Sequence, residues 1–134
     1  IVRRGGQLET VGTVVIGTVR GDLHSIGKDI VSTLLAAEGF EVVDLGVDVS
    51  PRSFVQAVSS VKASILAMSA LLTTTAPVQR EVINLLTQQH LRDRIHVIVG
   101  GGAITAGFAD SIGADGYADS APEGAELAKI LLGL

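Results

Sequence analysis

The sequence predicts a single α/β domain in which helices cover both faces of a parallel sheet. Short runs rich in Val and Ile alternate with longer amphipathic segments along the chain, and this alternation is typical of strand–helix–strand units. With 134 residues and 47% hydrophobic content, the chain can bury one core and has little room for a second. We expect a linker remnant over residues 1–10 and the domain itself over residues 11–134.

Short apolar runs are the expected strands. They cover residues 13–19, 41–45, 64–68, 95–99 and 115–118. Because crossovers between parallel strands are right-handed, few topologies are compatible with this order of elements. We predict a flavodoxin-like (Rossmann-like) doubly wound sheet with strand order 2-1-3-4-5, in which ligands bind beyond the carboxyl ends of the strands.

The expected helices lie between and after these strands. They cover residues 25–38, begin at Ser50-Pro51, cover residues 77–89, surround residues 104–112 and follow Ser120. Gly39 is the expected C-cap of the first helix, and Ser120 with Glu123 has the spacing of a capping box. The apolar positions expected to face inward in the first four helices are Ile26, Ile30, Leu34, Phe54, Val58, Val61, Val78, Val82, Leu85, Ile104, Phe108 and Ile112, and the last helix carries Leu127 and Leu131.

Composition argues against several classes of function. The formal net charge is -4, no Lys/Arg cluster occurs and Trp is absent, so a basic patch for nucleic acid is not expected. Without cysteine the chain has neither a disulfide framework nor a thiolate metal site. The apolar runs are too short to span a membrane, and no signal-peptide pattern is visible. We expect a cytoplasmic protein with no nucleic-acid or membrane partner.

The loop after the first strand contains a candidate metal ligand. Asp22 and His24 are two residues apart, so their side chains point the same way in an extended loop. A metal-bound His usually passes its second ring N–H to a carboxylate, which is the role Asp22 would fill, and Gly27 would let the backbone approach a large ligand. One His suits a metal held in a macrocycle better than zinc, which needs three or four protein ligands. Helix capping by Asp22 or Ser25, with His24 at the surface, is the simpler alternative.

Two further loops, after the third and fourth strands, are candidate parts of the same site. The loop of residues 69–75 is rich in hydroxyl groups that can hydrogen-bond a buried ligand, and Thr75 is also suited to cap the helix near Pro77. Three glycines at residues 100–102 make room for a flat group, although a flexible strand-to-helix loop is the favoured explanation when they are taken alone. They do not form Gly-x-Gly-x-x-Gly, so a dinucleotide site has little support.

Together these motifs resemble the signature of a known family. In chain order they are Asp22-x-His24-x-x-Gly27, Ser69-x-Leu71 and Gly100-Gly101. This pattern is similar to that of cobalamin-binding domains that hold the cofactor base-off/His-on, with the nucleotide base displaced from cobalt and a histidine in its place. The resemblance covers nearly the whole chain, and residues 14–31 most resemble the corrinoid proteins of methyltransferase systems, with methionine synthase next.

The resemblance implies a role for each motif. His24 is the lower axial ligand to cobalt, and Asp22 hydrogen-bonds its other ring nitrogen. Ser69 bonds the base of the nucleotide tail, Leu71 packs nearby, and the glycines make room for the tail. Thr75 falls where methionine synthase has a serine that extends the His–Asp pair into a proton relay. The catalytic set implied is Asp22, His24 and Thr75, and the cofactor-binding set is Asp22, Leu23, His24, Ser25, Ile26, Gly27, Ser69, Leu71, Thr73, Gly100, Gly101, Gly102 and Tyr117.

The function that the resemblance implies is carriage of a methyl group on the cobalt of cobalamin or a related corrinoid. The chain would serve a substrate methyltransferase and a methyl acceptor, such as tetrahydrofolate or a thiol, through two methyltransferase partners, and would have little activity alone. Corrinoid proteins of this kind usually have a helical cap domain, so a cap domain or subunit is a further expected partner. The alternatives are the cobalamin subunit of an adenosylcobalamin-dependent mutase, a cobalamin-binding sensor domain, and an interaction module without a cofactor.

Overall fold

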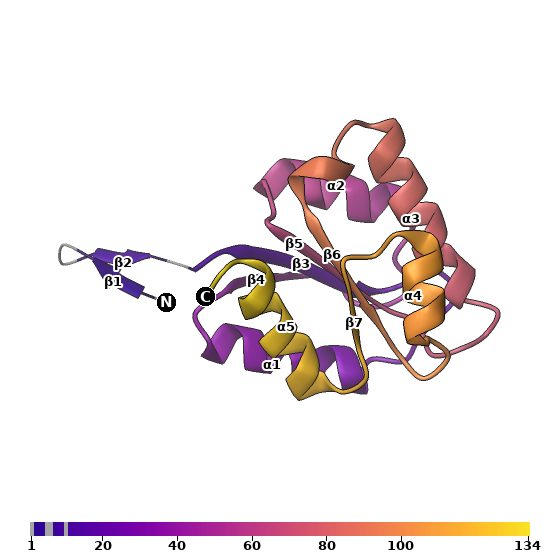
Figure 1. The fold of residues 1–134 in the computed structure, drawn as a ribbon, viewed down its shortest axis with the longest axis horizontal. Helices are drawn as coiled ribbons and strands as arrows, with labels where there is room; N and C mark the ends of the chain where they lie inside the picture. Colours follow the sequence, from indigo (N-terminus) through magenta and orange to yellow (C-terminus); the bar gives the residue numbers. More distant parts are fainter. Residues whose placement is uncertain (1, 5–6, 10) are drawn as a thin grey trace.

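A parallel sheet forms the centre of the computed structural model, which describes residues 2–4, 7–9 and 11–134 (Figure 1). Its five strands are β3 (Thr13–Thr18), β4 (Glu41–Asp44), β5 (Ile65–Ser69), β6 (His96–Gly100) and β7 (Gly116–Ala118). They lie in the order β4-β3-β5-β6-β7, and every neighbouring pair is parallel. Counted along the chain within this sheet, the order is 2-1-3-4-5, which confirms the predicted doubly wound fold.

Helices cover both faces of the sheet. Within the described residues they are α1 (Ile26–Ala37), α2 (Pro51–Val61), α3 (Ala76–Gln88), α4 (Ala106–Ile112) and α5 (Ala121–Leu131), with a 3-10 turn at Arg92–Arg94. Helices α1 and α5 pack together on one face, and α2, α3 and α4 cover the other (Figure 1). Because all five strands are parallel, the loops that follow them lie at one edge of the sheet, and the crevice for a ligand is expected beside β3, where the strand order reverses.

Two short strands precede this domain. Val2–Arg4 (β1) and Gln7–Glu9 (β2) pair antiparallel outside the main sheet. The predicted linker remnant over residues 1–10 includes positions outside the described residues, and the domain boundary at residue 11 stays a prediction.

Capping residues explain where two of the helices begin. The Ser50 hydroxyl accepts from the amide of Ser53 at 3.1 Å, and the Ser120 hydroxyl accepts from the amide of Glu123 at 3.4 Å, as their sequence positions predict. Gly39 follows α1 with a φ of 96°, a conformation that favours glycine and ends the helix.

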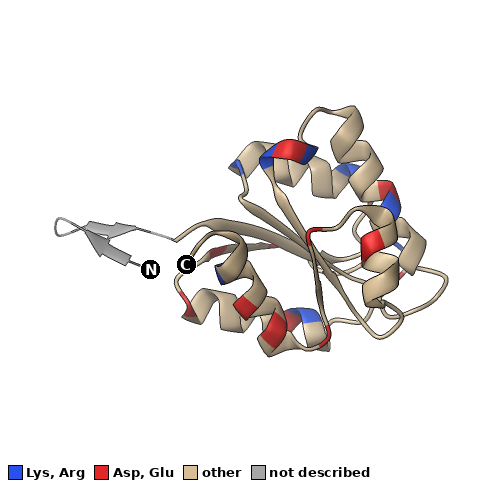
Figure 2. Cartoon of the chain, viewed as in Figure 1, with Lys and Arg blue, Asp and Glu red and all other residues tan. Residues whose placement is uncertain are grey.

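Charged residues lie on the helices, the loops and the edge strand β4 (Figure 2). Strands β3, β5, β6 and β7 contain no Lys, Arg, Asp or Glu, so the middle of the sheet is uncharged. Over the described residues, no helix combines the length and the apolar character that a membrane span requires.

The predicted inner face of α1 was wrong at two of its three positions, whereas Leu34 packs against the core. Ile26 and Ile30 are 79% and 46% exposed, whereas Lys28 and Leu35 are the buried residues of the helix. Lys28 is buried because its Nζ donates to the carboxylates of Asp29 and Asp44, at 2.6 and 2.9 Å. Hydrophobic periodicity treats a lysine as an outward position, so it cannot reveal an ion pair of this kind.

The other predicted inner positions are mostly correct. Phe54, Val58, Val78 and Val82 are buried against the sheet. Val61 was wrongly assigned, since it is the last residue of α2 and is 38% exposed.

Candidate functional site

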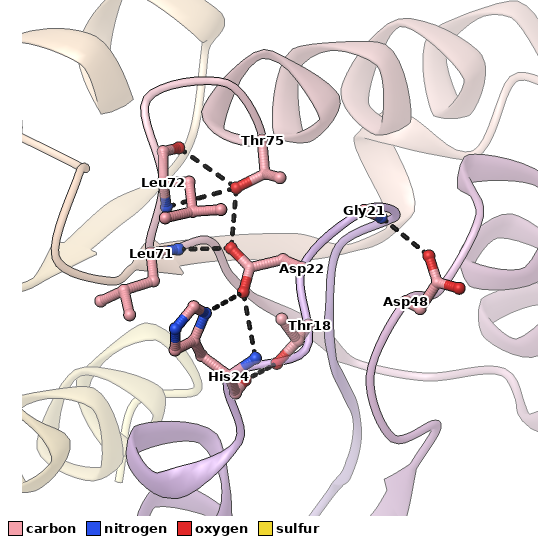
Figure 3. A network of polar contacts seen from close by, with 8 residues as sticks. All are labelled: Thr18, Gly21, Asp22, His24, Asp48, Leu71, Leu72 and Thr75. Carbon is pink, nitrogen blue, oxygen red and sulfur yellow. Dashed lines mark hydrogen bonds and ion pairs between the residues drawn. The ribbon is translucent and has the colours of Figure 1, made fainter.

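A buried carboxylate joins two loops at the carboxyl edge of the sheet (Figure 3). Asp22, in the loop between β3 and α1, is fully buried. Its Oδ1 lies 2.7 Å from Nδ1 of His24 and accepts from the His24 amide at 3.1 Å. Its Oδ2 accepts from the Leu71 amide and from the Thr75 hydroxyl, both at 2.7 Å. Asp22 therefore ties the histidine loop to the loop between β5 and α3.

These contacts decide the charge of Asp22. Burial by itself raises the pKa of the carboxyl, but hydrogen bonds from Leu71, Thr75 and His24 outweigh it and hold the pKa well below its usual value. Asp22 is therefore an ionised acceptor at physiological pH. The facing Nδ1 of His24 carries the proton, and Nε2 keeps its lone pair free to bind a metal.

Thr75 belongs to this network and caps no helix. It occupies the N-cap position of α3, but its side chain makes no capping hydrogen bond. A hydroxyl has one proton to donate, and Asp22 Oδ2 at 2.7 Å is a nearer and charged acceptor compared with the Leu72 carbonyl at 3.1 Å. The capping interpretation of Thr75 was wrong. Capping by Asp22 or Ser25 fails as well, because Ser25 precedes α1 without a side-chain cap.

A cavity of about 720 Å³ opens beside His24, between the sheet and helices α1 and α5. Its volume suits a small-molecule or cofactor site. Residues of β3, β5 and β6 form a mostly apolar inner wall, with Ile16, Ala67 and Ile98 among them. The predicted cofactor-binding residues that line the cavity are Leu23, His24, Ser25, Ile26, Gly27, Ser69, Leu71, Gly100, Gly101, Gly102 and Tyr117.

Two predicted residues are placed differently. Thr73 is exposed and is not part of the cavity wall. Asp22 is not part of the cavity wall but contacts two residues that are, Leu71 and His24, and the His24 side chain is 53% exposed.

The glycines of this site differ in what they allow. Gly101 has a φ of 121°, and a Cβ there would collide with the Ala70 carbonyl, so this glycine is needed for the close packing of two loops. A Cβ on Gly100 would lie 2.9 Å from the Ala118 carbonyl oxygen. The interpretation that these glycines only make room for a flat ligand is thus incomplete. Gly27 is different, because the space at its Cβ position is open.

Large apolar side chains surround His24 without cover. Leu23, Ile26 and Leu71 are 72%, 79% and 40% exposed, and all three line the cavity. Such a cluster indicates a binding surface. Among the described residues no group of three or more His, Cys, Asp and Glu side chains could hold a bare metal ion. One available imidazole nitrogen within an apolar rim fits a metal that brings its own flat set of ligands.

Several residues of the site had no signal in the sequence. Lys28 lines the cavity, and although burial lowers its pKa, hydrogen bonds and charge from Asp29 and Asp44 outweigh this and raise it. Gly124 of α5 lies beside Val31 of α1 in the cavity wall. Both depend on which helix packs against which, and neither belongs to a local motif.

A further missed residue, Gln79, stabilises the same edge of the sheet. Its side chain is fully buried, and Nε2 donates to the carbonyls of Met68 at 3.1 Å and Gly100 at 3.3 Å. Gln79 thereby holds the ends of β5 and β6 together on the face opposite the cavity.

Comparison with known proteins gives consistent matches. The profile of the B12 binding domain matches residues 12–126. The chain is 48% identical over 132 residues to dimethylamine corrinoid protein 3 of Methanosarcina mazei, covering 98% of this chain and 79% of that protein. Among solved structures, it resembles the monomethylamine corrinoid protein of Methanosarcina barkeri (36% identity, TM-score 0.84, covering 89% of this chain and 57% of that one). It also resembles the methanol:cobalamin methyltransferase complex MtaBC of the same organism (36% identity, TM-score 0.89, covering 96% of this chain and 49% of that one).

The fold, the imidazole of His24 and the cavity beside it fit a corrinoid-binding domain. The chain belongs to the B12-binding domain family and is homologous to the corrinoid proteins of methyltransferase systems. Its cofactor is cobalamin or a related corrinoid. Further curated relatives are longer, and the chain spans 59% to 62% of their length.

Proposed function

We propose that this chain carries a methyl group on the cobalt of a corrinoid, between a substrate methyltransferase and a methyl acceptor such as tetrahydrofolate or a thiol. The contact of 2.7 Å between Asp22 Oδ1 and His24 Nδ1, beside an apolar cavity, carries the proposal. Relatives named dimethylamine corrinoid proteins and a neighbour named a methyltransferase complex support the methyl-transfer context. A helical cap domain or subunit and two methyltransferase partners are part of the proposal.

The residues of the chain hold and tune the cofactor. When bound, the corrinoid supplies cobalt chemistry that accepts a methyl group and passes it on. His24 would hold the metal of the cofactor through Nε2, in the proposed base-off/His-on mode. Asp22 fixes the tautomer and orientation of the ring, and Thr75 fixes the second oxygen of Asp22. Ser69 and the glycines of residues 100–102 line the cavity, and in this proposal they would receive the nucleotide tail.

The same residues provide a place for a proton. Were His24 not bound to the metal, its Nε2 could take up a proton. The resulting imidazolium would be stabilised by the Asp22 carboxylate at 2.7 Å, which Thr75 in turn holds. Proton uptake would therefore favour the unbound histidine.

Electron paramagnetic resonance of the Co(II) form tests the mode of binding. The chain has three histidines, and ¹⁵N-labelled His should change the hyperfine lines of the protein with bound corrinoid. His24→Ala should abolish this nitrogen signal. His90→Asn is the matched control, because His90 is exposed, has a φ of 60° that Asn tolerates, and lies at the end of α3. Hyperfine lines that do not respond to the label would contradict the proposal.

The proton relay has its own test. Asn in place of Asp22 can still hold the ring by a hydrogen bond but cannot stabilise an imidazolium. The midpoint potential of the Co(II)/Co(I) couple should therefore depend less on pH in Asp22→Asn than in the parent. We expect the exchange also to weaken corrinoid affinity or activity by about 10- to 100-fold. Equal pH slopes in the two proteins would reduce Asp22 to a residue that only orients the loop.

A further inference from the structure

The main chain of His24 is held by a residue outside its loop. Thr18 is the last residue of β3, and its side chain is fully buried. Its hydroxyl donates to the main-chain carbonyl of His24 at 2.8 Å (Figure 3). A fully buried hydroxyl at a strand end needs a partner, and here that partner is the residue with the available imidazole.

Thr18 is itself fixed in the sheet. Its amide donates to the Gly46 carbonyl at 2.9 Å, and its carbonyl accepts from the Val49 amide at 3.0 Å. It is also paired with Ser69 of β5. The backbone that carries this hydroxyl is therefore held by contacts on both sides. Through the hydroxyl, the position of His24 is fixed relative to the sheet.

Two different groups hold the two sides of the His24 backbone. Asp22 Oδ1 accepts from the His24 amide at 3.1 Å, and Thr18 donates to the His24 carbonyl at 2.8 Å. With the N–H and C=O of one residue both bound, the direction of its Cα–Cβ bond is restricted. The contact between Asp22 Oδ1 and Nδ1 then fixes the ring at the other end of the side chain.

We infer that the Thr18 hydroxyl is a positioning group for His24, which keeps the imidazole where it can bind the metal of the cofactor. The inference rests on the proposed His-on binding, since only a ligating histidine needs such placement. Ligating groups must be held to within about 0.5 Å of their working position, and Asp22 ties the ring and its loop to the loop between β5 and α3. Thr18 connects the loop of His24 to the sheet.

The pair Thr18→Ser and Thr18→Ala isolates the hydroxyl. Both variants lose the same methyl group, so any cavity and its cost are shared, and they differ only in the hydrogen-bonding oxygen. Thr13→Val is the control for the strand, because Thr13 lies at the opposite end of β3 and its hydroxyl contacts Glu41 at 3.5 Å.

The first readout needs no cofactor. In the apo protein labelled with ¹⁵N-His, nuclear magnetic resonance reports three imidazole rings, with His90 and His96 as internal references. We expect Thr18→Ala to shift or broaden the His24 ring signals, and Thr18→Ser to leave them near the parent values. Shifts of all three rings would indicate a general loss of structure and would overturn the inference.

The second readout is the fraction of Co(II) corrinoid with a histidine nitrogen ligand. Loss of one hydrogen bond should lower the ratio of His-on to His-off in Thr18→Ala by about two- to tenfold relative to Thr18→Ser. If the parent protein has no histidine signal, the proposed function fails. If the parent has the signal and the Ser and Ala variants match it equally, the role of Thr18 is rejected while the proposed function stands.

Discussion

Helices cover both faces of the sheet, but the two faces differ in how completely side chains fill the space beneath the helices. On the face of α2, α3 and α4, Phe54, Leu66 and Leu86 are among the largest side chains, and all three are fully buried in a continuous core. On the face of α1 and α5, the core contains fewer buried residues, with Leu35 and Phe40 among them, and the space toward the carboxyl edge is a cavity of about 720 Å³. One face therefore supplies stability, and the other keeps room for a ligand.

This difference follows from which side chains face each other across the helices. Gly124 and Ala128 of α5 and Val31 of α1 are small for helix positions that face a sheet. Protein interiors are normally packed to the density of organic crystals, so small residues on facing elements leave a space that does not close by itself. The binding site therefore exists because one face of the sheet is underpacked, while the opposite face holds the sheet rigid.

The largest expected effect is on the closed face. Phe54→Ala should lower the free energy of unfolding of the apo protein by about 3–5 kcal/mol, because it removes a fully buried aromatic ring from the main core. Urea denaturation measures the change. A loss under about 1 kcal/mol would mean that the face of α2, α3 and α4 is not the tightly packed one.

Filling the open face should affect binding rather than stability. Gly124→Leu places a side chain in the cavity. A Cβ at this position would fit without a clash, since its nearest neighbour would be Val31 at 3.5 Å. We expect corrinoid affinity to fall by about 10- to 100-fold because the slot is overpacked, with the stability of the apo protein unchanged or higher, since glycine is a poor helix former.

The matched control for this substitution is Gly107→Leu, at an exposed position of α4 on the closed face. Corrinoid titration monitored by absorbance compares the two variants. Equal affinity in both would show that the cofactor does not use the space between α1 and α5.

Acid should weaken the link between the two loops at the site. The pKa of Asp22 is depressed in the folded state, so the unfolded chain binds this proton first as the pH falls. The contribution of Asp22 to stability is therefore present above about pH 4 and is lost as the pH falls below it. Asp22→Asn should be less stable at pH 7 by about 1–3 kcal/mol, with a flatter dependence of stability between pH 5 and 3.

Urea denaturation of the apo protein at several pH values checks this expectation. Asp110→Asn, on the exposed surface of α4, is the matched control and should retain the slope of the parent. If Asp22→Asn keeps that slope as well, hydrogen bonds to Asp22 do not hold the two loops together.

The smallest expected effect separates binding from folding at the rim of the cavity. Ile26→Ser should change the free energy of unfolding by no more than about 0.5 kcal/mol, because Ile26 is 79% exposed. It should weaken corrinoid binding by about 1 kcal/mol, because the variant lacks the apolar surface of Ile26 that the corrinoid would bury. Ile130→Ser of α5, 61% exposed and outside the cavity wall, should alter neither quantity. Equal corrinoid affinity in the two variants would remove Ile26 from the binding surface.

The order of elements and the loop of the candidate ligand were predictable from local signals. Alternation of apolar runs and amphipathic segments, with right-handed crossovers, predicted the strand order that the sheet has. Asp22 and His24 are two residues apart, so their contact requires no more than an extended loop. Resemblance added Thr75, which no spacing could link to Asp22, and the structure brings the two side chains within 2.7 Å.

The sequence by itself determined the strands, the helices and the pair of Asp22 and His24, because those depend on residues close together in the chain. Tertiary structure decided the rest of the site. The burial of Lys28 by Asp44, the bond from Thr18 to the His24 carbonyl and the collision that requires Gly101 all join separate segments. Hydrophobic periodicity wrongly placed Ile26 and Ile30 inside for the same reason, since exposure depends on what packs against a helix and not on its own pattern.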